Sequence, residues 1–171
     1  AITEPDAGTN TYKIQTTADR DGDEYVVNGQ KTFITGAKDA DYIQLVARTT
    51  PYEEVKGDNE AQGVSLFAVP TDTDGIEMDP LDLAIPEAVK QYTVYFDDVR
   101  VPAENMIGEE GKGFFHVFDA LNPERITTNA LSVGLGQFAL DRAVEYAKNR
   151  EVFDAPIGSH QGVQHPLSRA K

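Results

Sequence analysis

The periodicity of the sequence changes once, close to residues 105–113, and this change limits the folds that the chain can adopt. Before that point, short runs of β-branched and aromatic residues alternate with turn residues such as Gly, Asn and Asp. After it, apolar residues recur at helical spacing. We therefore expect an α+β fragment of a longer chain, with an antiparallel β sandwich or barrel over residues 1–108 and the beginning of an α-helical bundle over residues 109–171.

Six runs in the first half are predicted to be strands, because they are rich in β-branched and aromatic residues. The runs are 12–18, 24–28, 31–35, 42–48, 64–70 and 92–96. The pair Asn28-Gly29 has strand-forming residues on both sides. A type I′ turn requires positive φ at both central residues, which Asn and Gly adopt easily, so a β-hairpin is predicted at this pair.

The second half is predicted to contain three helical segments. Residues 113–121 form the first, and Asn122 is expected to cap a new helix that has Pro123 at its first position. We expect the other boundaries at Asn149, where this helix ends, and near Gln161, where the next helix begins.

The charge of the chain is strongly acidic. Its 171 residues include 29 acidic and 15 basic side chains, which gives a formal net charge of −14. Such a surface argues against nucleic acid or an anionic membrane as a partner. An acidic coat is also typical of proteins adapted to high salt, so a halophilic parent organism is expected.

Several other sites and signals are absent from the sequence. The chain has no cysteine, and its three histidines show none of the spacings typical of a metal site. No apolar run reaches the roughly 20 residues that span a bilayer, and no secretion signal is present. We therefore expect no disulfide, no metal and no membrane segment, and a location in the cytoplasm.

Two segments contain groups that suit a flat cofactor. Residues 2–10 combine hydroxyls, a proline and a glycine ahead of the first predicted strand, and such a loop can offer donors to the polar edge of a ring system. Phe33 and Thr35 lie two residues apart, on one face of a strand. Each feature also has an ordinary structural interpretation, as a surface turn and as a core aromatic.

The tetrad Asn122-Pro123-Glu124-Arg125 is the best candidate for catalysis. A carboxylate in the first turn of a helix is stabilised by the helix dipole, which explains Glu124 without any chemistry. Alternatively, a carboxylate that faces an apolar pocket has a raised pKa and can act as a general base. Arg125 is then either an ion-pair partner or a brace for the site.

Six segments, taken in order, resemble the acyl-CoA dehydrogenase family, and together they span nearly the whole chain. They are TEPDAGTN, YVVNGQKTFITGA, GVSLFAVP, YFDDVRVPAENMIGEEGKGF, LNPERI and REVFDAPIGSHQ. The resemblance implies the middle β domain and the start of the C-terminal helical domain of a flavoprotein that binds FAD. It also implies a homo-oligomer, either a dimer or a tetramer.

The resemblance assigns cofactor contacts to two groups of residues. The residues that match the family's contacts to the isoalloxazine edge are Ile2, Thr3, Gly8, Thr9, Phe33 and Thr35. The residues that match its contacts to the diphosphate and adenine of a neighbouring subunit's FAD are Arg150, Phe153 and Gln161. A guanidinium and an aromatic ring suit a pyrophosphate and a stacking base.

The resemblance also implies a reaction, the α,β-dehydrogenation of an acyl-CoA thioester in fatty acid β-oxidation. Glu124 matches the base of the isovaleryl-CoA and long-chain members, which lies immediately before an arginine, and it would remove the α-proton while hydride leaves the β-carbon for the flavin. Asn122 and Arg125 would contact the substrate. Electrons would then pass to an electron-transferring flavoprotein.

The sequence departs from the family pattern at four places. Residues 85–93 lack an arginine and a serine that other members have near the CoA arm, and Asp154 replaces a glycine. Asn122 and Asn10 each replace an aspartate. Two alternatives therefore accompany the dehydrogenase: an acyl-CoA oxidase or flavin monooxygenase of the same fold, and a non-catalytic interaction module.

Overall fold

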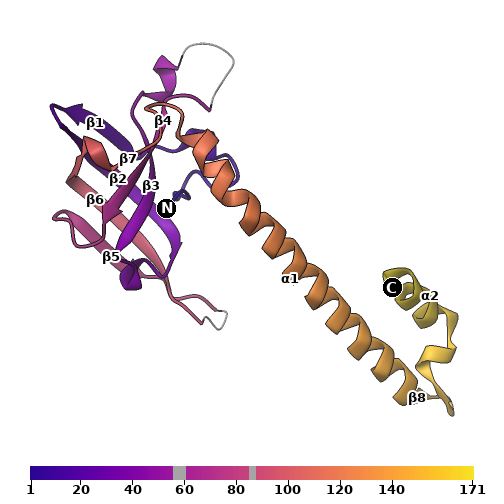
Figure 1. Ribbon diagram of the computed structural model, residues 1–171. Coiled ribbons are helices and arrows are strands. Elements are labelled where there is room, and N and C mark those ends of the chain that lie inside the picture. Colours follow the sequence, from indigo (N-terminus) through magenta and orange to yellow (C-terminus); the bar gives the residue numbers. More distant parts are fainter. Residues whose placement is uncertain (56–60, 85–87) are drawn as a thin grey trace. The chain divides into compact units, whose positions relative to one another are not determined.

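A computed structural model describes residues 1–55, 61–84 and 88–171, and the chain forms two compact units, Ala1–Asp119 and Ala120–Lys171 (Figure 1). The first unit contains a seven-stranded sheet and the start of helix α1 (Gly113–Asn149). The second contains the rest of α1, a short hairpin and helix α2 (Gln161–Ala170). A domain boundary at residue 108 stays a prediction.

The large sheet has the strand order β5-β6-β2-β1-β3-β4-β7. Its strands are β1 (Thr17–Asp21), β2 (Glu24–Thr35), β3 (Tyr42–Arg48), β4 (Val64–Pro70), β5 (Ile76–Pro80), β6 (Gln91–Pro102) and β7 (Met106–Ile107). Single 3₁₀ turns lie at Thr11–Lys13, Ala37–Asp39, Tyr52–Glu54 and Ala103–Asn105. The pairings are antiparallel, except that β1 and β3 are parallel where Thr17 faces Arg48.

The fold class predicted from the sequence is confirmed: a β unit precedes a helical one. One face of the sheet supplies most of the core, because alternate residues of each strand point to the same side. These buried residues include Tyr25, Val27, Leu45, Phe67, Val69, Val94, Phe96 and Val99. Burying each such side chain stabilises the fold by about 1.5–3 kcal/mol.

The prediction of a hairpin at Asn28-Gly29 was wrong. Strand β2 continues through this pair, and the pairing of β2 with β6 shifts register between Val27 and Gly29. A Cβ on Gly29 would lie 2.6 Å from Thr16 Oγ1, so the glycine allows a close approach of two chain segments. The chain turns instead between β1 and β2, where Gly22 has a φ of +65°.

The helix start predicted at Asn122 was also wrong. Helix α1 is continuous from Gly113 to Asn149, with Pro123 inside it. Proline removes one backbone donor, but the preference of the preceding residue for an extended conformation is a bias and not a prohibition. The helix end at Asn149 and the start of α2 at Gln161 agree with the prediction.

Candidate functional site

The N-terminal loop is attached to strand β2 by its backbone. Thr32 donates its N–H to the carbonyl of Thr3 at 2.9 Å. Within the loop, Glu4 and Ala7 exchange two backbone hydrogen bonds of 3.1 and 3.2 Å, which close a turn. Ile2 and Thr3 therefore lie beside the segment that carries Phe33 and Thr35, so the structure brings together two of the sequence-predicted groups.

A buried ion pair joins the same two segments. Lys31 Nζ lies 2.8 Å from Glu4 Oε1 and donates a second hydrogen bond, of 3.0 Å, to the carbonyl of Ile2. The Glu4 carboxylate also accepts the backbone N–H groups of Gln15 and Thr16, at 2.6 and 3.0 Å. Lys31 is fully buried, and Glu4 is only 6% exposed.

The environment shifts the pKa of both groups. Burial disfavours the charged ammonium and lowers the pKa of Lys31 to about 8, although the Glu4 carboxylate opposes this shift. Burial alone would raise the pKa of Glu4, but the charge of Lys31 and the hydrogen bonds that the carboxylate accepts hold it below its usual value. Each group thus stabilises the charged form of the other.

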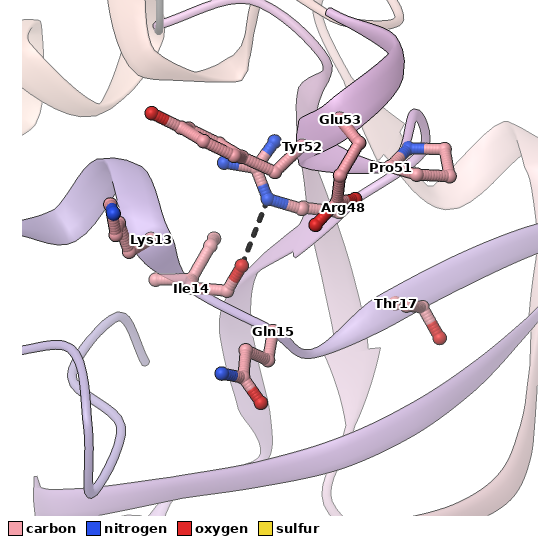
Figure 2. A pocket seen from close by; sticks show the side chains of 8 residues that line it. All are labelled: Lys13, Ile14, Gln15, Thr17, Arg48, Pro51, Tyr52 and Glu53. Carbon is pink, nitrogen blue, oxygen red and sulfur yellow. Dashed lines mark hydrogen bonds between the residues drawn. The ribbon is translucent and has the colours of Figure 1, made fainter.

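Arg48 holds the far end of the N-terminal loop. It is 4% exposed, donates from Nε to the carbonyl of Ile14 at 2.8 Å, and donates from Nη2 to the carbonyl of Tyr12. Figure 2 shows the Tyr52 ring over its guanidinium, with the guanidinium carbon 5.0 Å from the ring centroid. The third nitrogen, Nη1, is buried without a hydrogen-bond partner.

A cavity of about 320 Å³ lies beside this arginine (Figure 2). Its lining residues are Lys13, Ile14, Gln15, Thr17, Arg48, Pro51, Tyr52 and Glu53. None of the residues predicted to bind cofactor or substrate is among them. The cavity is therefore separate from the residues predicted to bind cofactor or substrate.

Phe33 has a backbone conformation that is rare for a residue with a side chain. Its φ is +59°, and it lies where the β2–β6 register shifts between Lys31 and Ile34. The ring is 56% exposed, and Thr35 is exposed as well. Beside them, the hydroxyls of Thr32 and Thr93 are 3.2 Å apart. Strain that is held in place by surrounding structure is typical of functional sites.

These residues fit the edge of a flavin. Thr3 is half-buried, Gly8 and Thr9 are exposed, and a Cβ on Gly8 would meet no atom within 4 Å. Backbone and hydroxyl donors thus lie on the loop, and the exposed aromatic ring lies on the neighbouring strand. A few placed polar groups beside an apolar surface are what a flat heterocycle requires.

The second unit places the other predicted FAD residues around a tight turn. Arg150 follows α1, and strands β8 (Glu151–Val152) and β9 (Ala155–Pro156) form a hairpin whose two-residue turn is Phe153-Asp154. Both turn residues have left-handed φ, +55° and +62°, and Phe153 is 91% exposed. After a 3₁₀ turn at Ile157–Ser159, Gln161 begins α2.

The predicted catalytic tetrad lies on α1. Asn122, Glu124 and Arg125 are all exposed, and Arg125 Nη1 is 3.5 Å from Asn122 Oδ1. The substituted segment 85–93 is described only in part, because residues 85–87 lie outside the described residues. Asn10, the other departure from the family pattern, is exposed and precedes the first 3₁₀ turn.

Sequence reasoning missed the buried pair beside the predicted flavin contacts, Glu4 and Lys31, and also missed Arg48 at the far end of the loop. One signal was available, because a lysine inside an apolar strand run and an arginine at the end of another are unusual in a core. Their partners could not be read from the sequence, since Glu4 and Lys31 are 27 residues apart and Arg48 bonds to backbone carbonyls.

Among the described residues, no helix is both long and apolar enough to cross a membrane. Within the same residues, no three His, Cys, Asp or Glu side chains are grouped to hold a metal ion.

The two halves of the chain match two domains of one known family. Residues 1–99 match the family described as acyl-CoA dehydrogenase, middle domain, and residues 111–171 match acyl-CoA dehydrogenase, C-terminal domain. The acyl-CoA dehydrogenase fadE12 of Mycobacterium bovis is 46% identical over 169 residues, which cover 99% of this chain and 42% of that protein.

Two solved structures extend the comparison. An acyl-CoA dehydrogenase from Geobacillus kaustophilus is 36% identical with a TM-score of 0.84, over 99% of this chain and 44% of the other. The prolyl acyl carrier protein oxidase AnaB is 29% identical with a TM-score of 0.85, over 99% and 44% of the two chains. The chain thus spans less than half the length of these relatives.

Proposed function

The chain belongs to the acyl-CoA dehydrogenase family, and from this we propose that it forms part of an FAD-dependent enzyme that removes two hydrogens from an acyl-CoA thioester. The observation that carries the proposal is the attachment of the N-terminal loop to β2, through Thr3 and Thr32, beside the exposed ring of Phe33. Donors for the polar edge of the isoalloxazine and an aromatic neighbour are thereby held together.

The proposed reaction divides between the cofactor and this chain. When bound, FAD would accept the hydride that leaves Cβ of the acyl group. Glu124 would take the proton from Cα, so that the electron pair of that C–H bond forms the double bond. Asn122 and Arg125, which contact each other on the same helix, would orient the thioester.

The surroundings of Glu124 support its role as the base. Side chains at positions i+7, i+11 and i+14 of a helix share a face with residue i. On α1 these positions hold Leu131, Leu135 and Phe138. An acyl chain that lies along this apolar stripe would displace water from the carboxylate, and a desolvated carboxylate is a stronger base.

We propose that the hairpin of the second unit serves the FAD of a neighbouring subunit. The exposed Phe153 ring offers a stacking surface, and the Arg150 guanidinium suits a pyrophosphate. Gln161 at the start of α2 would donate to the adenine end. The functional protein would then be a homo-oligomer, and an electron-transferring flavoprotein would reoxidise it.

The proposal is tested by the product. The full-length protein that contains this chain is loaded with FAD and incubated with acyl-CoA thioesters of graded chain length, and products are measured by mass spectrometry. We expect an enoyl-CoA that is lighter than its substrate by two hydrogens. If no acyl-CoA loses two hydrogens while FAD stays bound, the proposal fails.

An oxidase is the second candidate, and two observations favour it. The oxidase AnaB matches this chain with a TM-score of 0.85 over 44% of its own length, and the segment 85–93 lacks the family's arginine and serine near the CoA arm. In that reaction, oxygen would take the electrons in place of a carrier protein. Hydrogen peroxide formed in equal amount with the enoyl-CoA, in air, would identify the oxidase, and enoyl-CoA formed without peroxide would identify the dehydrogenase.

A further inference from the structure

The buried pair of Glu4 and Lys31 connects the two segments that carry the proposed flavin contacts. We propose that Glu4 and Lys31 are positioning residues that set the geometry of the flavin site, and that they control the affinity for FAD without touching it. This inference rests on the proposed function, because it presupposes that the loop and β2 hold a flavin.

Lys31 fixes the direction of a donor that belongs to the site. Its ammonium is held by Glu4 at 2.8 Å and binds the carbonyl of Ile2 at 3.0 Å. Because a trans peptide is planar, the N–H of Thr3 points opposite to that carbonyl. By binding the Ile2 carbonyl, the lysine makes the Thr3 N–H point away from Lys31. This N–H is one of the backbone donors proposed to contact the isoalloxazine.

Glu4 keeps the lysine in place. Its carboxylate accepts the N–H groups of Gln15 and Thr16 as well as the ammonium, and its own backbone belongs to the turn closed with Ala7. A carboxylate with three donors has little freedom to move. The loop is thus connected to β2 through the Glu4 carboxylate, which is held by Lys31 on one side and by the backbone of Gln15 and Thr16 on the other.

The other contacts between these segments leave a specific task to the pair. The hydrogen bond from the N–H of Thr32 to the carbonyl of Thr3 holds one side of the loop backbone, and it involves no side chain. Lys31 holds the preceding carbonyl, that of Ile2. Removing the lysine would keep the first attachment but release the Ile2 carbonyl and the Glu4 carboxylate, so the loop would stay on β2 while the Thr3 N–H loses its fixed direction.

The test separates positioning from stability by comparing three variants of the full-length protein: Glu4→Gln, Lys31→Met and the double variant. Each single change leaves one buried charge unpaired and should lower the stability strongly, whereas the double variant has no unpaired charge and should regain stability. The hydrogen bond to Ile2 is absent in Lys31→Met and in the double variant. We therefore expect both to bind FAD about tenfold or more weakly, as measured by quenching of flavin fluorescence.

Two control variants complete the test. Arg100→Gln removes the exposed ion pairs with Asp21 and Glu24, and Val69→Ala opens a gap in the core of β4. We expect both to bind FAD like the unchanged protein, although Val69→Ala is less stable. The inference is overturned if the Lys31 variants bind FAD as tightly as the unchanged protein, or if their loss of affinity is no larger than Val69→Ala shows for the same loss of stability. In either case the proposed function stands. If the unchanged protein binds no FAD, both fail.

Discussion

Four residues other than glycine have a left-handed backbone, among the residues that the structure describes: Phe33, Asp98, Phe153 and Asp154. Two of them, Phe33 and Phe153, are residues that the family resemblance assigns to FAD. Both rings are exposed, at 56% and 91%. Each such backbone conformation costs free energy of folding, and this cost is consistent with the proposed role of both rings in binding FAD.

Asp154 is the residue at which this strain can be removed. The family has glycine here, and the φ of +62° explains that preference, because glycine adopts a left-handed backbone without steric cost. We expect Asp154→Gly to stabilise the protein by about 0.5–1 kcal/mol, measured by thermal unfolding. Asp98→Gly is the matched control: although φ there is +50°, its carboxylate accepts a hydrogen bond from Asn28 at 3.0 Å, so that change should not stabilise. Equal effects of both changes would contradict this account.

Glu4 gives the stability a predictable dependence on pH. Its pKa is lower in the folded protein than in the unfolded chain, so the folded state binds fewer protons as the pH falls toward that range. The contribution of Glu4 is therefore complete at neutral pH and is lost as the pH falls through the folded-state pKa. We expect the free energy of unfolding, measured with urea between pH 7 and 3, to fall less steeply for Glu4→Gln. Parallel curves would show that Glu4 contributes nothing to acid unfolding.

At the scale of elements, strand β2 owes its shape to two register shifts. One lies between Val27 and Gly29, and the other lies between Lys31 and Ile34. Bulges of this kind bend a strand and redirect its side chains. The second shift turns Phe33 outward while Lys31 and Thr32 stay buried. The element that carries the candidate flavin contacts is thus a bent strand and not a hairpin.

The first shift depends on a glycine, and its replacement should be costly. We expect Gly29→Ala to destabilise the protein by about 2–4 kcal/mol, because a Cβ there would lie 2.7 Å from the backbone Cα of Thr16. Gly22→Ala is the control, since Gly22 also has a positive φ but its Cβ would meet no atom within 4 Å. Urea unfolding of both variants checks this prediction, and equal losses would show that backbone conformation and not the close approach matters.

Much of the fold could be predicted from the sequence, because its signals are local. The runs 42–48 and 64–70 coincide with β3 and β4, and the end of α1 and the start of α2 follow helix signals nearby. The errors at Asn28-Gly29 and Asn122-Pro123 share one cause. Asn28-Gly29 is a local signal for a turn, and tertiary contacts outweighed it. Asn122-Pro123 is a local signal for a helix start, and the helix on both sides of it outweighed that signal.

The candidate site was predictable only where it resembles known motifs. Ile2, Thr3, Phe33 and Thr35 were assigned in this way, and the structure brings their segments together. The supporting ion pair was not found, since its members are far apart in the sequence and charged residues are normally exposed.

At the scale of the whole molecule, the net charge of −14 predicts a response to salt. Like charges repel over about 30 Å at 0.01 M salt but only about 3 Å at 1 M. We expect the melting temperature to rise between low and molar potassium chloride, because screening removes this repulsion in the folded state. A melting temperature that is constant or falls over this range would argue against adaptation to high salt.

The central claim is that this chain holds a flavin and supplies the base that acts on an acyl-CoA. The most direct measurement is the visible flavin spectrum of the full-length protein without oxygen, before and after acyl-CoA is added, for the unchanged protein and for Glu124→Gln. We predict that the flavin absorbance of the unchanged protein bleaches, and that the variant keeps its FAD but loses at least about 99% of the bleaching rate. Flavin that no acyl-CoA bleaches, or a variant that bleaches as fast as the unchanged protein, would contradict the claim.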